Sequence, residues 1–114
     1  MMTYDYDQAN SVIHLRASGV LKPADPISYF KQIDEDPTFI PKAEERIYFT
    51  ELDDIEFTFT DVMAIRDAFE LYAHGEKISH GIFIVDSDLS FGMANMVIAV
   101  FNDVFGKFTI KRIG

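Results

Sequence analysis

The chain has 114 residues, the usual size of one domain with one hydrophobic core, and we expect residues 1–114 to form a single domain. Its formal charge of −9 comes from 19 acidic and 10 basic residues, which makes nucleic acid and anionic membranes unfavourable partners. Because cysteine is absent, disulfides and thiolate metal sites are excluded. The N-terminal residues lack the features of a signal peptide, and no apolar run approaches the roughly 20 residues of a membrane span, so we expect a cytoplasmic protein.

The first third of the chain predicts two strands and a helix. Polar and apolar side chains alternate over Thr3–Asp7 and again over Val12–Ala17 with a turn between, which predicts an antiparallel hairpin. Ser18 and Gly19 are expected to break this pattern. A helix is predicted from Asp25, which can cap its first turn, to Asp36, where the following proline ends it.

The middle of the chain predicts a strand, an acidic loop and a second helix. The strand covers Arg46–Thr50, and the four carboxylates of Glu51–Glu56 favour a solvated loop. The helix is predicted to begin at Thr58, which has Asp61 three residues later in an arrangement like a capping box. His74 and Gly75 are expected to stop this helix.

The last third of the chain predicts a buried strand, a long helix and an edge strand. Gly81–Val85 is continuously apolar, which is typical of a central parallel strand covered on both faces. The third helix is predicted from about Leu89 to Phe105, and Lys107–Arg112 suits an edge strand. An opening hairpin followed by three αβ units predicts an α/β fold, with helices packed on a mixed five-stranded sheet.

Four short patterns carry a family resemblance. They are Gly19–Leu21 before the first helix, Asp36–Phe39 before the third strand, Thr58–Val62 at the second helix and Asp88–Ala94 at the third. Together they resemble the STAS-like family, the fold of bacterial anti-sigma-factor antagonists, and especially its SpoIIAA-like branch. The resemblance covers nearly the whole chain and implies this fold and a function in binding.

One feature of that family has no counterpart here. The antagonist proteins carry a phosphorylatable serine between the third strand and the second helix, but Glu51–Thr58 contains no serine. Its carboxylates would also repel an incoming phosphate. The resemblance therefore does not imply a phosphorylation switch, and whether Thr58 or Thr60 is ever phosphorylated stays open.

The polar stretch Asp86–Gly92 is the most conspicuous motif of the sequence. It does not match a calcium loop, because the required glycine and glutamate are absent. Its aspartates would repel an anion at the N-terminus of the following helix. The favoured interpretation is that Ser87 or Asp88 caps the helix while Gly92 allows close packing.

No catalytic residue, cofactor or metal ligand is predicted. His14, His74 and His80 have no ligand-like spacing, and His74 is expected at a helix end, where its charged form would suit the dipole. An enzyme would require a cleft in which His14, His80 or the carboxylates of Glu51–Glu56 converge.

The predicted third helix is apolar around more than half of its circumference, which exceeds the usual stripe of a surface helix. One face is expected to pack on the sheet, and it comprises Leu89, Met93, Met96, Val97, Val100, Phe101 and Val104. A second seam lies on the back of the helix and comprises Phe91, Ala94, Ile98 and Phe105.

Three partners for this back seam stay open. The neighbouring helix of the same chain would cover it with Met63 and Leu71. A protein partner, most economically a second copy in a two-fold homodimer, would cover it from outside. The third possibility is an apolar small molecule between helix and sheet, with Met93, Met96 and Phe101 as its walls.

The leading functional expectation is a non-enzymatic STAS-like regulatory module that acts by protein association, including self-association. The alternative is a binder or sensor of a small apolar ligand in a pocket between the third helix and the sheet.

Overall fold

A five-stranded sheet with the strand order β1-β2-β3-β4-β5 forms the frame of the computed structural model, which describes residues 1–114. β1 is antiparallel to β2, and the other neighbouring pairs are parallel, so the predicted mixed sheet is confirmed. The strands are β1 (Met2–Asp7), β2 (Val12–Leu21), β3 (Ala43–Ile55), β4 (Ile78–Val85) and β5 (Phe108–Arg112).

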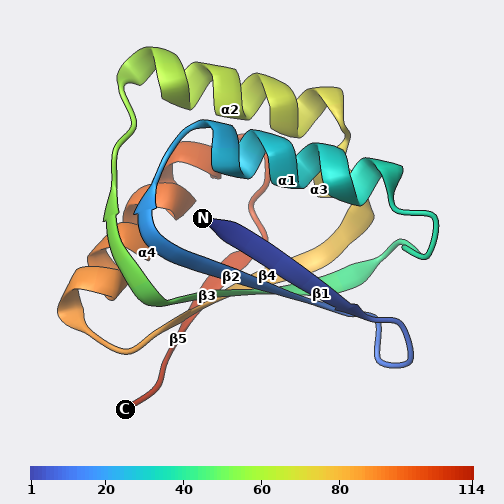
Figure 1. Ribbon diagram of the computed structural model, residues 1–114, viewed down its shortest axis with the longest axis horizontal. Helices are drawn as coiled ribbons and strands as arrows, with labels where there is room; N and C mark the ends of the chain where they lie inside the picture. The colour runs from blue at the N-terminus through green and yellow to red at the C-terminus, as the bar shows by residue number, and fades with distance from the viewer.

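The helices lie together on one face of this sheet (Figure 1). They are α1 (Ala24–Glu35), α2 (Phe59–Leu71), the short α3 (His74–Lys77) and α4 (Asp88–Phe101). Sequential parallel strands joined by right-handed crossovers place every connecting helix on the same side. None of these helices has the length and apolar character needed to cross a membrane.

The opposite face of the sheet has no helix over it. Side chains alternate between the two faces along a strand, so Phe83 points to the helices while Ile82 and Ile84 point away from them. Gly81–Val85 lies in a central parallel strand, as predicted, but helices cover only one of its faces. On the outer face Ile84 is buried and Ile82 is half-buried.

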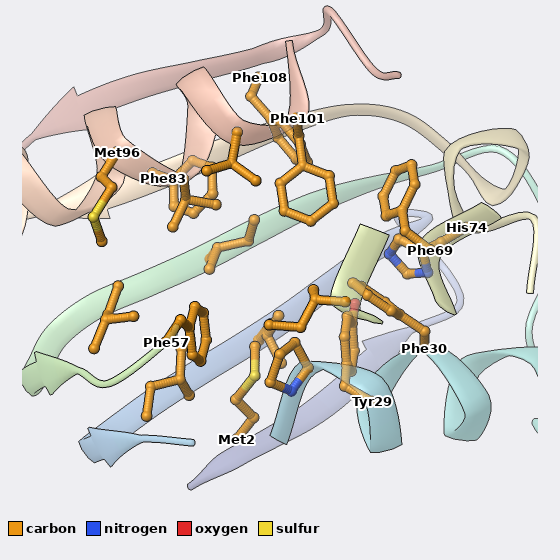
Figure 2. Close-up of a pocket in the computed structure, with 18 of the residues that line it drawn as sticks. Met2, Tyr29, Phe30, Phe57, Phe69, His74, Phe83, Met96, Phe101 and Phe108 are labelled. Carbon is orange, nitrogen blue, oxygen red and sulfur yellow. The ribbon is translucent and has the colours of Figure 1, made fainter. Parts of the chain in front are cut away.

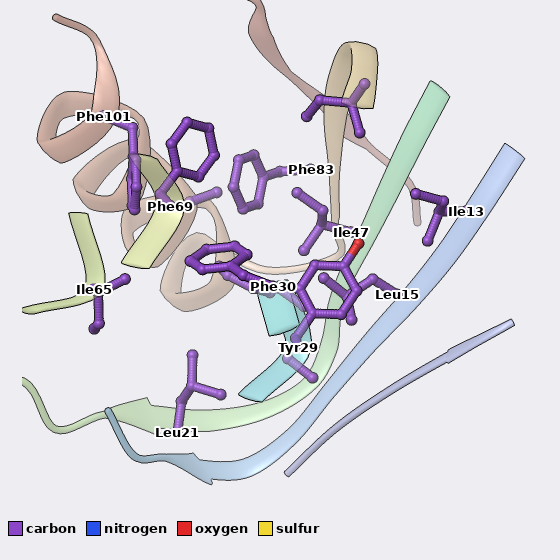
Figure 3. Packing of buried hydrophobic residues seen from close by; sticks show 14 of the residues in the cluster. Ile13, Leu15, Leu21, Tyr29, Phe30, Ile47, Ile65, Phe69, Phe83 and Phe101 are labelled. Carbon is purple, nitrogen blue, oxygen red and sulfur yellow. The ribbon is translucent and has the colours of Figure 1, made fainter. Parts of the chain in front are cut away.

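The core is the layer between the sheet and the helices (Figure 3). Every second residue of the strands points into it, such as Leu15 of β2, Ile47 of β3 and Phe83 of β4. Phe30 of α1 and Phe69 of α2 pack on them, with their ring centroids 5.4 Å apart. Aromatic pairs at this spacing add to the stabilisation that burial alone provides.

Two strands continue further than the sequence predicts. β2 runs past Gly19, which has a left-handed φ of 66°, and its last residues pair with the end of β3. Glu51–Ile55 is therefore strand rather than the predicted loop. Leu52 is buried while Glu51 and Asp53 are exposed, so the strand keeps one apolar face despite its carboxylates. Two register shifts between β2 and β3 accommodate this extension.

Two of the three helix starts agree closely with the predictions. α1 begins at Ala24 after Pro23 and has no side-chain cap, so the predicted cap at Asp25 is wrong. Asp25 lies inside the first turn, and its side chain accepts a hydrogen bond from the Lys22 N–H group. Thr58 caps α2 and forms a capping box with Asp61, as predicted. Ser87 caps α4, and the Ser90 side chain completes this second box. The polar stretch before α4 is thus a helix cap, but Gly92 has no atom near the place of a Cβ, so its predicted packing role is wrong.

The helix ends differ more from the predictions. α2 ends at Leu71, and His74 and Gly75 belong to the separate helix α3 instead of stopping α2. Ala73 lies between the two helices in the left-handed conformation, with a φ of 51°. α4 ends at Phe101, four residues before the predicted end at Phe105.

Candidate functional site

An apolar cavity of about 150 Å³ lies between the sheet and the helices. Of the 21 residues that line it, 18 are hydrophobic. They come from α1, α2, α4 and the inner face of the sheet, so segments from the whole chain enclose one space (Figure 2). The chemistry of this lining favours an apolar occupant over water.

The two ends of the cavity differ in character. Met96 and Phe57 lie at one end, and Phe69 and His74 lie at the other (Figure 2). Met96 of α4 is 47% exposed although it lines the cavity, so this end of the space lies near the molecular surface. The other end is deep in the core, because His74 has no exposed surface.

A buried polar cluster occupies this deep end. Glu45 points inward from β3, and its Oε2 accepts a hydrogen bond from the Tyr29 hydroxyl at 2.5 Å. His74 Nε2 lies 2.6 Å from the same oxygen. The exposed fractions of Glu45, Tyr29 and His74 are 2%, 3% and 0%. We call these residues the Glu45 cluster.

Apolar and aromatic side chains surround the Glu45 cluster. The His74 ring lies 4.8 Å from the Phe30 ring and 5.5 Å from the Phe69 ring, measured between centroids. Burial, together with the nearby Glu45 carboxylate, raises the pKa of Tyr29 well above its ordinary value. The Tyr29 hydroxyl therefore keeps its proton and acts as a donor to Glu45.

The hydrogen bonding of the Glu45 cluster is incomplete. Both bonds to Glu45 reach Oε2, and Oε1 has no hydrogen-bond partner in the chain. His74 Nδ1 is enclosed by protein atoms and also has no partner. Native proteins satisfy most buried polar atoms, and a buried ionic cluster often contributes less to stability than apolar side chains of similar volume. Such a cluster beside a cavity is typical of a functional site.

The sequence interpretation missed the Glu45 cluster. Residues 43, 45, 47 and 49 of β3 all face the core, and Glu45 is the one charged side chain among them. The predicted strand began at Arg46, so this interruption of the apolar alternation lay outside it. A strand begun at Ala43 would have placed a carboxylate at a core position, which is the available sequence signal. His74 was expected at a helix end, where its charged form would suit the helix dipole. It is instead buried in the core.

Two of the three residues predicted for ligand binding line the cavity, and the third does not. Met96 and Phe101 line the cavity, as the alternative hypothesis expected of a pocket between the third helix and the sheet. Met93 is buried but does not line the cavity. Binding itself remains a prediction for these residues.

Two of the four residues of the predicted back seam are at least partly exposed, and the other two are buried. Phe91 is 40% exposed and Ile98 is half-buried against the core, whereas Ala94 and Phe105 are buried within the chain. The four residues therefore do not form one continuous surface, and Ala94 and Phe105 belong to the core. A role of Phe91 and Ile98 in association stays a prediction.

Two local features explain this correction. The buried Ser90 side chain accepts hydrogen bonds from the backbone N–H groups of Asp86 and Ser87, which turns its side of α4 inward. Ala94 lies one turn further on the same side and is buried with it. Phe105 lies beyond the end of α4, so a helical projection does not apply to it, and its ring packs 4.7 Å from that of Phe108.

The other two histidines lie on the open face of the sheet. His14 Nδ1 is 3.0 Å from the Tyr48 hydroxyl, and His80 Nε2 is 2.8 Å from Glu44. Burial raises the pKa of Glu44, but hydrogen bonds from Arg46 and His80 outweigh this effect and lower it. The carboxylates of Glu51–Glu56 do not join this group, and the chain has no cluster of three or more potential ligands that could hold a metal ion.

Comparisons with known proteins concern the fold. No protein-family model and no curated protein sequence matches the chain. Among solved structures, the chain is similar to an uncharacterised protein of the DUF3478 family from Shewanella loihica, described as having a SpoIIAA-like fold. The two chains share 18% sequence identity at a TM-score of 0.57, over 97% of this chain and 84% of the other. The chain therefore has the SpoIIAA-like α/β fold that its sequence resembles.

Proposed function

We propose that this protein is a non-enzymatic module that binds a small apolar molecule in the cavity between α4, the other helices and the sheet. The observation that carries this proposal is the cavity of about 150 Å³ with 18 hydrophobic residues among its 21 lining residues. A catalytic site needs several polar groups that reach the substrate, and this lining offers few.

The packing density of protein interiors supports an occupant. Protein interiors are packed about as densely as organic crystals, with few voids larger than a water molecule. The side chains that line an apolar space of about 150 Å³ make fewer contacts than a closely packed core would give them. A ligand that fills this space recovers part of the loss through dispersion contacts. An engineered cavity of about this volume binds benzene, so we infer an occupant with about one ring or a short alkyl chain.

Toluene is a suitable first probe of this proposal. We expect it to raise the free energy of unfolding by about 1.4 kcal/mol when its free concentration is about ten times its dissociation constant. The variant Ile65→Phe should lose this effect, because Ile65 is buried and lines the cavity. Thermal unfolding with and without toluene measures the difference.

The control for this experiment is Met63→Phe on the same helix. Met63 is exposed and does not line the cavity, so its enlargement should leave the toluene effect unchanged. Equal stabilisation of the Ile65→Phe variant, or no stabilisation of the wild-type protein at toluene saturation, would contradict the proposal.

Association with a second copy is the other candidate function. It is favoured by three exposed apolar side chains on α4, with exposed fractions of 61% for Leu89, 40% for Phe91 and 47% for Met96. Leu89 and Met96 lie two turns apart on the same side of α4, whereas Phe91 points to a different side. Exposed apolar side chains that lie together, as Leu89 and Met96 do, commonly mark an interface. A two-fold dimer would bring the same helix of each copy together.

Light scattering over a concentration series tests this second candidate. We expect a concentration-dependent dimer that Leu89→Glu dissociates without unfolding the chain, because Leu89 is 61% exposed on the side of α4 that also carries Met96. Phe59→Glu is the matched control, because Phe59 is exposed on α2 and lies outside the proposed surface. If the wild-type protein stays monomeric at every concentration, the self-association proposal is contradicted.

A further inference from the structure

The Glu45 carboxylate links the polar cluster to the apolar cavity. Glu45 lines the cavity together with Tyr29 and His74. Its Oε2 is occupied by these two neighbours, while Oε1 has no partner in the chain. Oε1 is not fully enclosed by protein atoms, unlike His74 Nδ1, and Glu45 is one of the residues that line the cavity.

The neighbours of Glu45 occupy one of its two oxygens. The Tyr29 hydroxyl donates to Oε2, and His74 Nε2 lies within hydrogen-bond distance of the same oxygen. Both contacts converge on Oε2, which leaves the acceptor capacity of Oε1 unused. Oε1 is then an acceptor that needs a donor from elsewhere. His74 Nδ1 is enclosed, so an occupant reaches the cluster through Glu45.

We propose that the occupant is a neutral apolar alcohol or phenol, whose hydroxyl donates a hydrogen bond to Glu45 Oε1 while its hydrocarbon part fills the cavity. This inference rests on the proposed ligand-binding function. It adds the chemical class of the ligand and names the residue that selects it.

The same geometry makes other classes of small molecule weaker ligands. A pure hydrocarbon leaves the buried Oε1 unpartnered, which costs free energy that a donor would recover. A carboxylate ligand would place a second negative charge beside Glu45 in an apolar environment, which is strongly unfavourable. An ether or ketone has an acceptor oxygen and cannot donate to Oε1. The site therefore selects ligands that carry a hydroxyl donor.

Toluene, phenol and anisole form a probe set for this inference. Toluene and phenol have nearly the same size and differ in the donor, while anisole has an acceptor oxygen without a donor. We expect calorimetric titration at neutral pH to give a phenol dissociation constant about tenfold lower than that of toluene, as one hydrogen bond to a charged group provides. Anisole should bind no more tightly than toluene.

A variant without polar atoms in the cluster serves as the control. In Tyr29→Phe/Glu45→Met/His74→Leu we expect phenol to bind more weakly than toluene, because its hydroxyl loses water without gaining a partner. Tyr29→Phe alone keeps Glu45 Oε1 and should keep the preference for phenol.

The possible outcomes distinguish a failure of this inference from a failure of the proposed ligand-binding function. If toluene, phenol and anisole all fail to bind, the ligand-binding function itself is contradicted. If toluene binds and phenol binds more weakly in the wild-type protein, the function stands and the alcohol class is overturned. Tighter binding of anisole than of phenol, or a phenol preference that survives in the triple variant, also overturns it.

Discussion

The substitution Glu45→Met is expected to lower the free energy of unfolding by about 2–6 kcal/mol, because it leaves two buried polar groups without a partner at a cost of about 1–3 kcal/mol each. The Tyr29 hydroxyl and His74 Nε2 both hydrogen-bond to Glu45 Oε2, so both lose their partner in this variant. Neither group can turn to solvent, because both residues are buried. Denaturant unfolding followed by circular dichroism measures the loss.

The triple variant Tyr29→Phe/Glu45→Met/His74→Leu is the control for this prediction. It removes the polar atoms together, and we expect it to recover most or all of the stability that Glu45→Met loses. Such recovery would mean that the Glu45 cluster is dispensable for stability, which supports a role in binding. A triple variant as unstable as Glu45→Met would instead make the cluster a structural element.

The substitution Phe69→Ala is also expected to lower the free energy of unfolding by about 3–5 kcal/mol. The Phe69 ring packs against those of Phe30, His74, Phe101 and Phe105, with centroid distances between 5.1 and 6.0 Å. Its removal would enlarge a cavity that it already lines, and the surrounding rings have little freedom to refill the space. Thermal and denaturant unfolding of the variant measure this cost.

Phe59→Ala is the matched control on the same helix. Phe59 is 81% exposed, so the same loss of a ring should change the stability by no more than about 0.5 kcal/mol. Similar effects of the two substitutions would contradict the placement of α2, because this placement alone makes Phe69 internal and Phe59 external.

The order of helices and strands was predictable because local sequence patterns specify each element. Alternation predicted the opening hairpin, and the cap at Thr58 with Asp61 predicted the start of α2. The ends of elements depend on tertiary contacts instead. β3 continues to Ile55 because β2 lies beside it, and α4 stops at Phe101 where Phe105 turns back onto Phe108. No local pattern in those segments specifies either event.

The candidate site was less predictable than the fold. The cavity is a space that side chains from four helices and the sheet leave between them, and its volume depends on packing that no single segment determines. Met96 and Phe101 were predicted as ligand contacts from the excess of apolar residues on α4. Glu45 and His74 are 29 residues apart in the sequence, and the fold is required to bring them together.

The two functional proposals assign different parts of α4 to binding. Phe101 and Val97 face the cavity, whereas Leu89 and Phe91 face solvent. Met96 belongs to both surfaces, since it lines the cavity and is half exposed. An associated second copy would therefore cover the end of the cavity at Met96, so the ligand-binding and association proposals are compatible.

Methyl NMR during a toluene titration is the most direct test of the claim that the cavity binds apolar molecules. We expect saturable shifts at the lining methyl groups of Leu21, Ile65 and Val97, with little change at Ile13, Ile78 and Val85, which are core residues outside the cavity. The first set of shifts should follow a single dissociation constant. Unchanged lining methyl groups at toluene saturation, or equal shifts in both sets, would contradict a binding site in this cavity.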